Sequence, residues 1–530
     1  MNLGSHEEIQ LLALLIAAAA LLVAAPFLRI PFPILLVLGG LALGFVPGLP
    51  ELRLPPELVL VAFLPPLLYA SAFFTSLRDL RANLRPISLL SIGLVGATSV
   101  GVAVVAHAAI DGMPWGAAFT LGAVVSPTDP LAATAIARRL GVPRRLVTII
   151  EGESLVNDAT ALVVYRVAVA AVLTGSFSLW HAGFRLAVNA AAGIAIGLGV
   201  GYLVRQVRRR LNKPPLEITL ALLTGYFAYL PADALHVSGV LAAVTAGIYM
   251  GWHTPELTTA QTRLQGDAFW EILVFVLNSA LFILVGLQLH GIVNRLHGRS
   301  TGSLLADAAL VSGTVIAIRI LWVFPNTYLP RWAFRSIRER DPYPPWQYPV
   351  LVSWAGMRGA VSLAAALAIP LSTDAGASFP ARDLIVFLTF GVILATLVLQ
   401  GLSLPLVIRM LGVEDDGLAE REDAKARIRA AEAALERLDE LVAEEWVRDD
   451  TAERLRGLYN FRRTRFAARF DDGDDGSIEE QSLAYQRLRR ELLDAERTAV
   501  VRLRREGYIN DEVMNRVQRD LDLEDTRLDI

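Results

Sequence analysis

The chain has 530 residues, of which 54% are hydrophobic and 19% are charged, and its formal net charge is −3. An apolar share above the roughly 45–50% of soluble domains predicts a membrane protein. The sequence contains no cysteine, which excludes disulfides, thiol catalysis and thiolate metal sites.

Apolar runs between charged or Pro/Gly-rich breaks predict an all-α polytopic membrane protein with about thirteen transmembrane helices. The first six predicted spans are Ile9–Leu28, Pro33–Pro47, Glu57–Ser76, Ile87–Ala109, Trp115–Ala137 and Leu146–Leu173. The remaining spans are Trp180–Val204, Pro215–Leu230, Val237–Trp252, Phe269–His290, Ala306–Phe324, Tyr348–Ile369 and Leu384–Met410.

Every second connection between the predicted spans is rich in arginine, whereas the connections between them carry few basic residues. The arginine-rich connections include Arg78–Arg85, Arg138–Arg145, Arg205–Lys213 and Arg331–Arg340. Short basic loops stay on the cytoplasmic side of a membrane. The pattern therefore predicts a multi-pass protein of the cell membrane, with its N-terminus outside and its C-terminal tail in the cytoplasm.

Two of the predicted spans are interrupted. The fifth contains Ser126–Pro130 (SPTDP) and the twelfth contains Gly356–Gly359 (GMRG). Proline removes a backbone donor, and non-helical backbone at membrane depth survives only where it is buried in protein or lines a cavity. Because the two spans lie seven apart, they cross in opposite directions. This predicts an inverted repeat of six-helix halves, spans one to six against eight to thirteen, with two broken crossing helices at the binding site.

The composition changes after Met410, which divides the sequence into a transmembrane domain over residues 1–412 and a charged tail over residues 413–530. Within the tail, Glu420–Trp446 and Glu479–Arg504 read as helices, separated by a break at Asp471–Gly476, and a short last segment ends near Leu523. The tail shows no phosphate loop, so we interpret it as a cytoplasmic helical module with a regulatory or dimerising role.

The sixth span carries the polar run Glu151–Asp158 (EGESLVND). A charged side chain at the bilayer centre costs roughly 2.5–3.5 kcal/mol on insertion scales. At about 1.5 Å per residue, Asp158 lies roughly 18 Å along the span, near the midplane. Ser154 and Asp158 share one helix face, and Glu153 and Asn157 share the adjacent one. These oxygen atoms suit a hard cation. The alternative interpretation is that the polar run only makes polar contacts between buried helices.

Three further charges fall inside predicted spans. Asp129 lies beside Thr128 at the proline break, where freed carbonyls and a half-helix N-terminus suit an ion, or where the aspartate simply caps a kinked helix. Arg319 in the eleventh span and Arg358 in the twelfth each need a carboxylate partner or water. Glu153 is a candidate partner for either arginine.

Several segments together carry a family resemblance. Ser126–Ala132 (SPTDPLA), Glu151–Asp158 (EGESLVND) and Gly356–Val361 (GMRGAV) occur in this order, with Phe63–Leu68 (FLPPLL) and Phe282–Leu287 (FILVGL) beside them. They resemble the sodium/proton antiporters of the first cation:proton antiporter family, the bacterial NhaP-type and eukaryotic NHE-type exchangers. The resemblance covers residues 10–410.

The resemblance implies a role for each polar residue of the site. Asp158 is implied as the carboxylate that carries the ion and the proton, and Asn157 marks the electroneutral type. Asp158, Ser154 and Thr128 are implied as Na⁺ ligands, with Asp129 as a supporting carboxylate.

A structural ion pair is implied as well, formed by Glu153 with Arg319 or, as second choice, with Arg358. The sequence also departs from the family at one position. Some archaeal members carry an acidic residue after the Leu-Leu-aromatic run of the third span, whereas here Tyr69 is followed by Ala70 and Ser71. The preference for Na⁺ therefore does not carry over from the resemblance.

The sequence and the resemblance together predict a secondary active transporter that exchanges Na⁺ or Li⁺ for H⁺, electroneutrally and one for one, by alternating access. Family members serve pH homeostasis and are commonly homodimers in membrane lipid, without a cofactor and without a nucleic acid partner.

The same residues leave alternative functions open. A K⁺/H⁺ antiporter using the same site is the alternative. A cation channel is a weaker one, because no segment resembles a carbonyl-lined filter loop. An enzyme is not expected, because the seven histidines form no metal spacing and no nucleophile–base pair.

Overall fold

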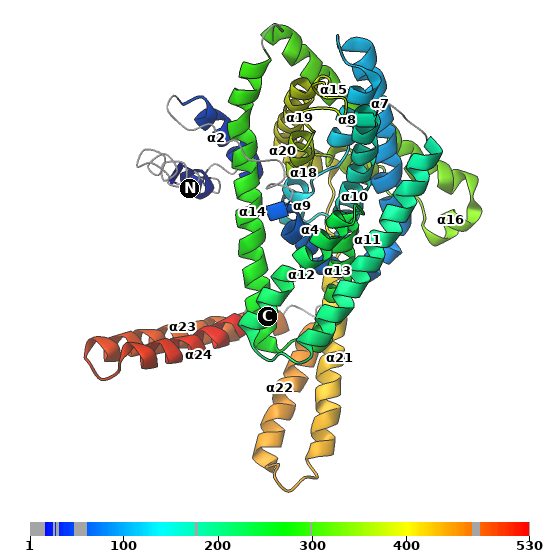
Figure 1. Cartoon of the computed structure of the whole chain (residues 1–530). Helices are drawn as coiled ribbons and strands as arrows, with labels where there is room; N and C mark the ends of the chain where they lie inside the picture. The colour runs from blue at the N-terminus through cyan, green and yellow to red at the C-terminus, as the bar shows by residue number, and fades with distance from the viewer. Residues whose placement is uncertain are drawn as a thin grey trace. The chain divides into compact units, whose positions relative to one another are not determined.

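The structure is a computed structural model, which describes residues 16–17, 19–24, 27, 31–46, 61–174, 179–296, 299–468 and 477–528 (Figure 1). These residues form helices and loops, and their only β-type pairing is an isolated antiparallel bridge between Ser372 and Ser378. The chain divides into two compact units, Met1–Asp415 and Asp416–Ile530. The predicted first span, Ile9–Leu28, and the predicted break at Asp471–Gly476 lie largely or wholly outside the described residues.

The first unit is a bundle of helices. Its first part contains α2 (Phe32–Gly44), α4 (Leu64–Phe74), α5 (Leu77–Ala82), α6 (Leu84–Ser88), the π-helix η1 (Leu89–Leu94), α7 (Val95–Ala109), α8 (Trp115–Val125), α9 (Leu131–Arg139), α10 (Arg144–Thr174) and α11 (Leu179–Arg208). Its second part contains α12 (Pro214–Ala234), α13 (Gly239–Leu257), α14 (Ala260–Arg295), α15 (Thr301–Ala333), α16 (Arg335–Arg340), α17 (Gln347–Trp354), α18 (Ala360–Leu367), α19 (Arg382–Ala395), the π-helix η2 (Thr396–Gln400) and α20 (Gly401–Leu411).

Six helical segments of the described residues are long and apolar enough to cross a membrane. They are Leu84–Ala109, Arg144–Thr174, Ala187–Arg208, Ala260–Leu284, Thr301–Ala333 and Arg382–Leu411. Shorter apolar helices are Phe32–Gly44, Leu64–Phe74 and Trp115–Val125.

Two of the long helices extend beyond their predicted spans. α14 begins at Ala260 instead of Phe269, because its first turns are polar and hydropathy does not mark them. α15 continues through Pro325 and Pro330 to Ala333. Prolines are tolerated inside a membrane helix when neighbouring groups satisfy the carbonyls that they free.

Both predicted interruptions are present, and they contact one another. Residues 126–130 separate α8 from α9, and residues 355–359 separate α17 from α18. The backbone nitrogen of Asp129 donates to the carbonyl oxygen of Met357 at 2.8 Å. The two non-helical segments are thus joined by a backbone hydrogen bond, which satisfies polar groups that the broken helices leave open.

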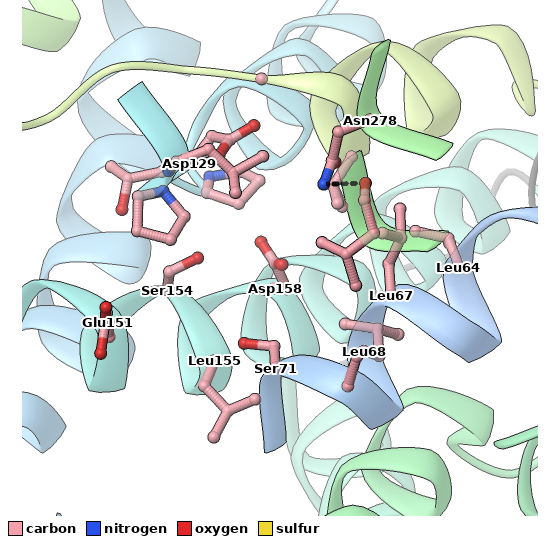
Figure 2. Close-up of a pocket in the computed structure, with 18 of the residues that line it drawn as sticks. Leu64, Leu67, Leu68, Ser71, Asp129, Glu151, Ser154, Leu155, Asp158 and Asn278 are labelled. Carbon is pink, nitrogen blue, oxygen red and sulfur yellow. Dashed lines mark hydrogen bonds between the residues drawn. The ribbon is translucent and has the colours of Figure 1, made fainter. Parts of the chain in front are cut away.

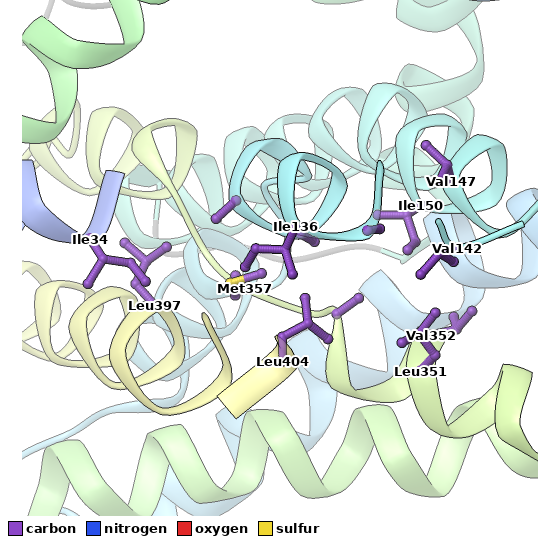
Figure 3. Packing of buried hydrophobic residues seen from close by; sticks show 14 of the residues in the cluster. Ile34, Ile136, Val142, Val147, Ile150, Leu351, Val352, Met357, Leu397 and Leu404 are labelled. Carbon is purple, nitrogen blue, oxygen red and sulfur yellow. The ribbon is translucent and has the colours of Figure 1, made fainter. Parts of the chain in front are cut away.

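An apolar cluster fixes the second interruption from one side (Figure 3). The side chain of Met357 is fully buried and belongs to a cluster with Ile34 of α2, Ile136 of α9, and Leu397 and Leu404 of η2 and α20. In a bilayer such contacts stabilise through close packing, because lipid tails are as apolar as the side chains. Packing of Met357 therefore holds the backbone next to Arg358 in place.

The second unit consists of two helical hairpins. They are formed by α21 (Leu418–Leu441) with α22 (Asp449–Ala468), and by α23 (Ser477–Arg505) with α24 (Asp511–Leu528). In α21 the buried residues Ala424, Ala431 and Leu438 recur every seven positions, as on the packed face of a helical pair. The helix α22 was missing from the sequence-based assignment, because its apolar residues are scattered among arginines and form no stripe.

Candidate functional site

The centre of the first unit holds a cavity of about 270 Å³, which we call the Asp158 cavity (Figure 2). Its walls come from α4, the α8–α9 break, α10, α14 and the start of α18. Ser154 and Asp158, one turn apart on α10, both line it. The helical spacing that the sequence provides thus brings the hydroxyl and the carboxylate to one side of the cavity.

Asp158 is a buried carboxylate in the wall of this cavity. The residue is 9% exposed, and its neighbours in the wall include Leu68, Leu155 and Leu281. Within the described part of the chain its carboxylate has neither a hydrogen bond nor an ion pair. A buried carboxylate without a partner is strongly disfavoured unless it binds a cation or a proton.

Glu153 lies on the adjacent face of α10 and has a cationic partner. Arg319 Nη1 and Nη2 donate to Glu153 Oε1 at 2.5 Å and Oε2 at 2.8 Å, a bidentate pair in which neither side chain is more than 1% exposed. Arg319 also donates to the carbonyl of Val352, near the end of α17, at 3.1 Å from Nε and 2.9 Å from Nη2. Of the two arginines that the sequence left open, Arg319 is the one that pairs with Glu153.

Thr128 and Asn157 extend this network. The hydroxyl of Thr128 donates to Glu153 Oε1 at 3.0 Å and accepts from Asn157 Nδ2 at 2.7 Å. Thr128 lines the Asp158 cavity, whereas Asn157 is 1% exposed and is not part of the cavity wall. Asn157 therefore reaches the cavity through Thr128, and the proton of the Thr128 hydroxyl is directed at Glu153.

Asp129 and Arg358 bind the two helix ends on either side of the α8–α9 break. Asp129 binds the N-terminus of α9, and Arg358 binds the C-terminus of α8. Asp129 Oδ1 accepts from the backbone nitrogen of Leu131 at 3.0 Å, at the N-terminus of α9. Arg358, which is fully buried, donates from Nε to the carbonyl of Val125, the last residue of α8, at 3.1 Å, and from Nη1 to the carbonyl of Gly356. A carboxylate at a helix N-terminus and a cation at a helix C-terminus are both stabilising. Asp129 thus caps α9 while also lining the cavity.

The charges around the two non-helical segments, residues 126–130 and 355–359, do not sum to zero. They comprise three carboxylates, Glu153, Asp129 and Asp158, and two guanidinium groups, Arg319 and Arg358. One negative charge is left over. Because Glu153 is paired and Asp129 caps a helix, this charge is best assigned to Asp158.

Glu151, to which the sequence gave no role, forms a second ion pair. Its Oε1 lies 2.5 Å from Arg138 Nη2, and the side chains of Glu151 and Arg138 are 33% and 66% exposed. Both line the Asp158 cavity. The pair thus marks the solvent-exposed end of the cavity and leaves its net charge unchanged.

Asn278 and Ser71 are among the polar residues of the cavity wall to which the sequence gave no role. Asn278 of α14 is 5% exposed, and its Nδ2 donates to the carbonyl of Val274 at 2.9 Å (Figure 2). This bond commits the amide nitrogen and leaves Oδ1 as an acceptor. Ser71 of α4 lies beside Asp158 in the same view. The sequence does carry a signal for Asn278, which is an amide within an apolar span. Polar groups in membrane helices are rare without a function.

Gly359 allows the closest approach at the crossing. A Cβ atom at this position would lie 1.8 Å from Asp129 Oδ2, although the backbone angle φ of −140° itself permits any residue. We expect Gly359→Ala to displace Asp129 and to lower the free energy of unfolding by about 1–3 kcal/mol, with loss of activity. Gly313→Ala in α15 is the control, because an added Cβ there meets nothing within 4 Å. Equal unfolding temperatures of the two purified variants would contradict this steric role.

Comparisons with known proteins identify the family of the chain. The family model of the transmembrane sodium/hydrogen exchanger matches residues 11–410. An uncharacterised Na⁺/H⁺ exchanger of Mycobacterium tuberculosis is 40% identical over 504 residues, which is 94% of this chain and 92% of that protein. The sodium, potassium, lithium and rubidium/H⁺ antiporter of Bacillus pumilus is 34% identical over 408 residues, 75% of this chain and 60% of that protein.

A solved structure shows the same fold. The sodium proton antiporter MjNhaP1 of Methanocaldococcus jannaschii matches with a TM-score of 0.59 and 18% identity, over 77% of this chain and 100% of that chain. At this identity the match shows a shared helical architecture only. The family model and the relatives in sequence show more, and on their evidence the chain belongs to the family of transmembrane sodium/hydrogen exchangers.

Proposed function

We propose that the protein exchanges Na⁺ or Li⁺ for H⁺, one cation for one proton, by alternating access. The observation that carries this proposal is the single uncompensated carboxylate, Asp158, at the crossing of the broken helices. One monovalent cation or one proton neutralises the site. The two loaded forms then carry the same charge, whereas the empty site is charged and crosses the bilayer interior poorly. Exchange is obligatory for this reason.

The proposed Na⁺ ligands are Asp158, Ser154 and Thr128, with Asp129 as the supporting carboxylate. Ser154 and Asp158 share the cavity face of α10, and the carbonyl of Thr128 accepts no backbone hydrogen bond from the described residues. Oxygen atoms of these kinds are the ligands that hard cations prefer. Asn157 acts indirectly, because it orients the hydroxyl of Thr128.

Asn278 is proposed to complete the ligand set from α14, through its Oδ1 atom. We expect Asn278→Ala to raise the Na⁺ concentration for half-maximal exchange about fivefold while the maximal rate is retained, as loss of one neutral polar contact predicts. Na⁺ titrations of proton flux in proteoliposomes measure this. Asn326→Ala is a matched control, because Asn326 makes the same bond to a carbonyl four residues back, at 2.9 Å, and lies outside the Asp158 cavity. Equal shifts in both variants would remove Asn278 from the ligand set.

Exchange of K⁺ for H⁺ is the second candidate, favoured by the name of the Bacillus pumilus relative, which includes potassium. The same carboxylate can neutralise either cation. Titrations with Na⁺, Li⁺ and K⁺ in proteoliposomes separate the two functions. The proposal expects proton flux with Na⁺ and Li⁺ at millimolar concentrations, and an equal response to K⁺ would move the assignment to the second candidate.

The finer architecture is proposed with this function. We infer about thirteen transmembrane helices in an inverted repeat of six-helix halves, supported by the two broken helix pairs that meet at one hydrogen bond. We also propose a homodimer with a role in pH homeostasis, as the family resemblance implies. The transmembrane domain over residues 1–412 is proposed to carry transport, and residues 413–530 to form a cytoplasmic regulatory module. The N-terminus is then outside, as the arginine-rich connections indicate.

A further inference from the structure

A second cavity of about 80 Å³ lies apart from the Asp158 cavity, among η1, α10, α15 and α17. Its polar side is formed by Arg85, Arg145 and Arg331 around Asp341, and we call it the arginine cavity. These residues come from three of the arginine-rich connections, which are far apart in the sequence. Neither the transport site nor the family resemblance uses them.

The three guanidinium groups converge on one carboxylate. Arg331 Nη2 lies 2.5 Å from Asp341 Oδ2, and Arg331 Nε donates to the carbonyl oxygen of Asp341 at 3.0 Å. Arg145 Nη2 donates to Asp341 Oδ1 at 2.8 Å. Arg85 Nη1 is 3.8 Å from Asp341 Oδ2, and this nitrogen is buried and has no hydrogen-bond partner among the described residues. Three cations thus share one anion, and a donor remains unused.

The remaining wall of the arginine cavity is apolar, with Leu89, Ile149 and Val323 among its residues. Three large aromatic side chains that lie close in sequence to Arg331 and Asp341 are exposed. Trp332 is 75% exposed, Phe334 60% and Trp346 60%. Exposed tryptophans and aromatic residues that flank apolar helices gather at the level of the lipid headgroups. This pattern puts the segment that carries Arg331 and Asp341 at the level of the lipid headgroups, whereas Ile149 and Val323 of the apolar wall are buried in the bundle.

We propose that the arginine cavity binds the phosphate group of an anionic membrane lipid. Arginine guanidinium groups bind phosphate oxygens with paired, charge-assisted hydrogen bonds. The volume is room for about two to three water molecules at roughly 30 Å³ each, which suits one phosphate group and excludes a nucleotide. At this volume the acyl chains stay outside the cavity, in the bilayer. The same chemistry fits inorganic phosphate, but only a lipid also uses the aromatic rim.

The arginine cavity adjoins elements that hold the transport site. Ile149 lies on α10, one turn before Glu153, and Val352 of α17 lines the cavity while its carbonyl accepts from Arg319. A bound phosphate group cross-links α6, the start of α10 and the end of α15 through Arg85, Arg145 and Arg331. Binding is accordingly expected to raise the unfolding temperature of the protein, whatever ion the Asp158 cavity transports.

Binding is tested on the purified full chain in detergent by thermal unfolding and native mass spectrometry. Phosphatidylglycerol, phosphatidylcholine and inorganic phosphate are the probes. We expect phosphatidylglycerol to raise the unfolding temperature and to stay bound, and phosphatidylcholine to do neither. Arg85→Gln should weaken phosphatidylglycerol binding about fivefold, as expected for one arginine near an anionic headgroup.

The matched control is Arg335→Gln on α16. Arg335 is 82% exposed and paired with Glu339, so its loss removes the same charge from the same region without touching the cavity. Arg145→Gln is the second cavity variant, which keeps the test decisive if Arg85→Gln folds poorly. Equal weakening in the cavity variants and in Arg335→Gln would overturn the proposal, as would equal binding of both lipids. Protection by inorganic phosphate alone, lost in the cavity variants, would support the phosphate site and assign it a soluble ligand.

Discussion

Asp158→Asn is expected to abolish cation–proton exchange, down to the rate of protein-free liposomes. The asparagine is neutral with or without a bound ion, so it removes both the charge that attracts a cation and the proton that competes with it. The protein should still fold, because the substitution removes a buried charge that has no partner among the described residues. Na⁺-driven proton flux in proteoliposomes and the unfolding temperature of the purified variant measure these two effects.

The control for this variant is Asp233→Asn. Asp233 is 44% exposed, and its partner is Arg166 at 2.7 Å, so the same change of side chain is made at a residue that does not line the Asp158 cavity. Exchange should be retained there. Na⁺ should also raise the unfolding temperature of the wild-type protein and of Asp233→Asn, but not that of Asp158→Asn, because only a protein that binds the ion is stabilised by it. Retained exchange in Asp158→Asn would refute the assignment of the carrier.

Glu153→Ala is expected to lower the free energy of unfolding by about 3–5 kcal/mol, because it leaves the guanidinium of Arg319 buried and uncompensated. It also removes the acceptor that orients Thr128. The free energy follows from reversible unfolding in mixed micelles. Replacing both partners, as in Glu153→Leu with Arg319→Met, should recover much of the loss, since a buried ion pair adds little beyond an apolar pair.

Glu151→Ala provides the comparison for the ion pair. Glu151 lies two residues away on the same helix and also pairs with an arginine, but its side chain is 33% exposed and that of Arg138 is 66% exposed. Exposed pairs contribute only about 0–1 kcal/mol. A loss of stability in Glu153→Ala no larger than in Glu151→Ala would show that the pair with Arg319 is not a structural element of the site.

The sequence was informative where charge or proline stands in an apolar span. Both broken helices follow from Pro127, Pro130 and the glycines around Arg358, and the cavity face of α10 follows from the spacing of Ser154 and Asp158. These features are local, because they depend on residues that lie within two helical turns of one another.

The rest depends on contacts between distant segments. Arg319 and Glu153 are 166 residues apart, and only the packing of α10 against α15 and α17 decides which arginine reaches the carboxylate. The position of Asn278 of α14 in the cavity wall has the same origin. Hydropathy also missed the polar first turns of α14 and the whole of α22, because neither has an apolar stripe.

The central claim is that one uncompensated carboxylate exchanges one cation for one proton. Proteoliposomes with a fixed Na⁺ gradient and a varied pH difference reveal the condition at which net flux stops. For one-for-one exchange, a tenfold Na⁺ gradient is balanced by about one pH unit, since each corresponds to about 1.4 kcal/mol. A membrane potential of about 100 mV, worth about 2.3 kcal/mol per transported charge, should leave this balance point unchanged. A balance point that moves with the potential would contradict the account.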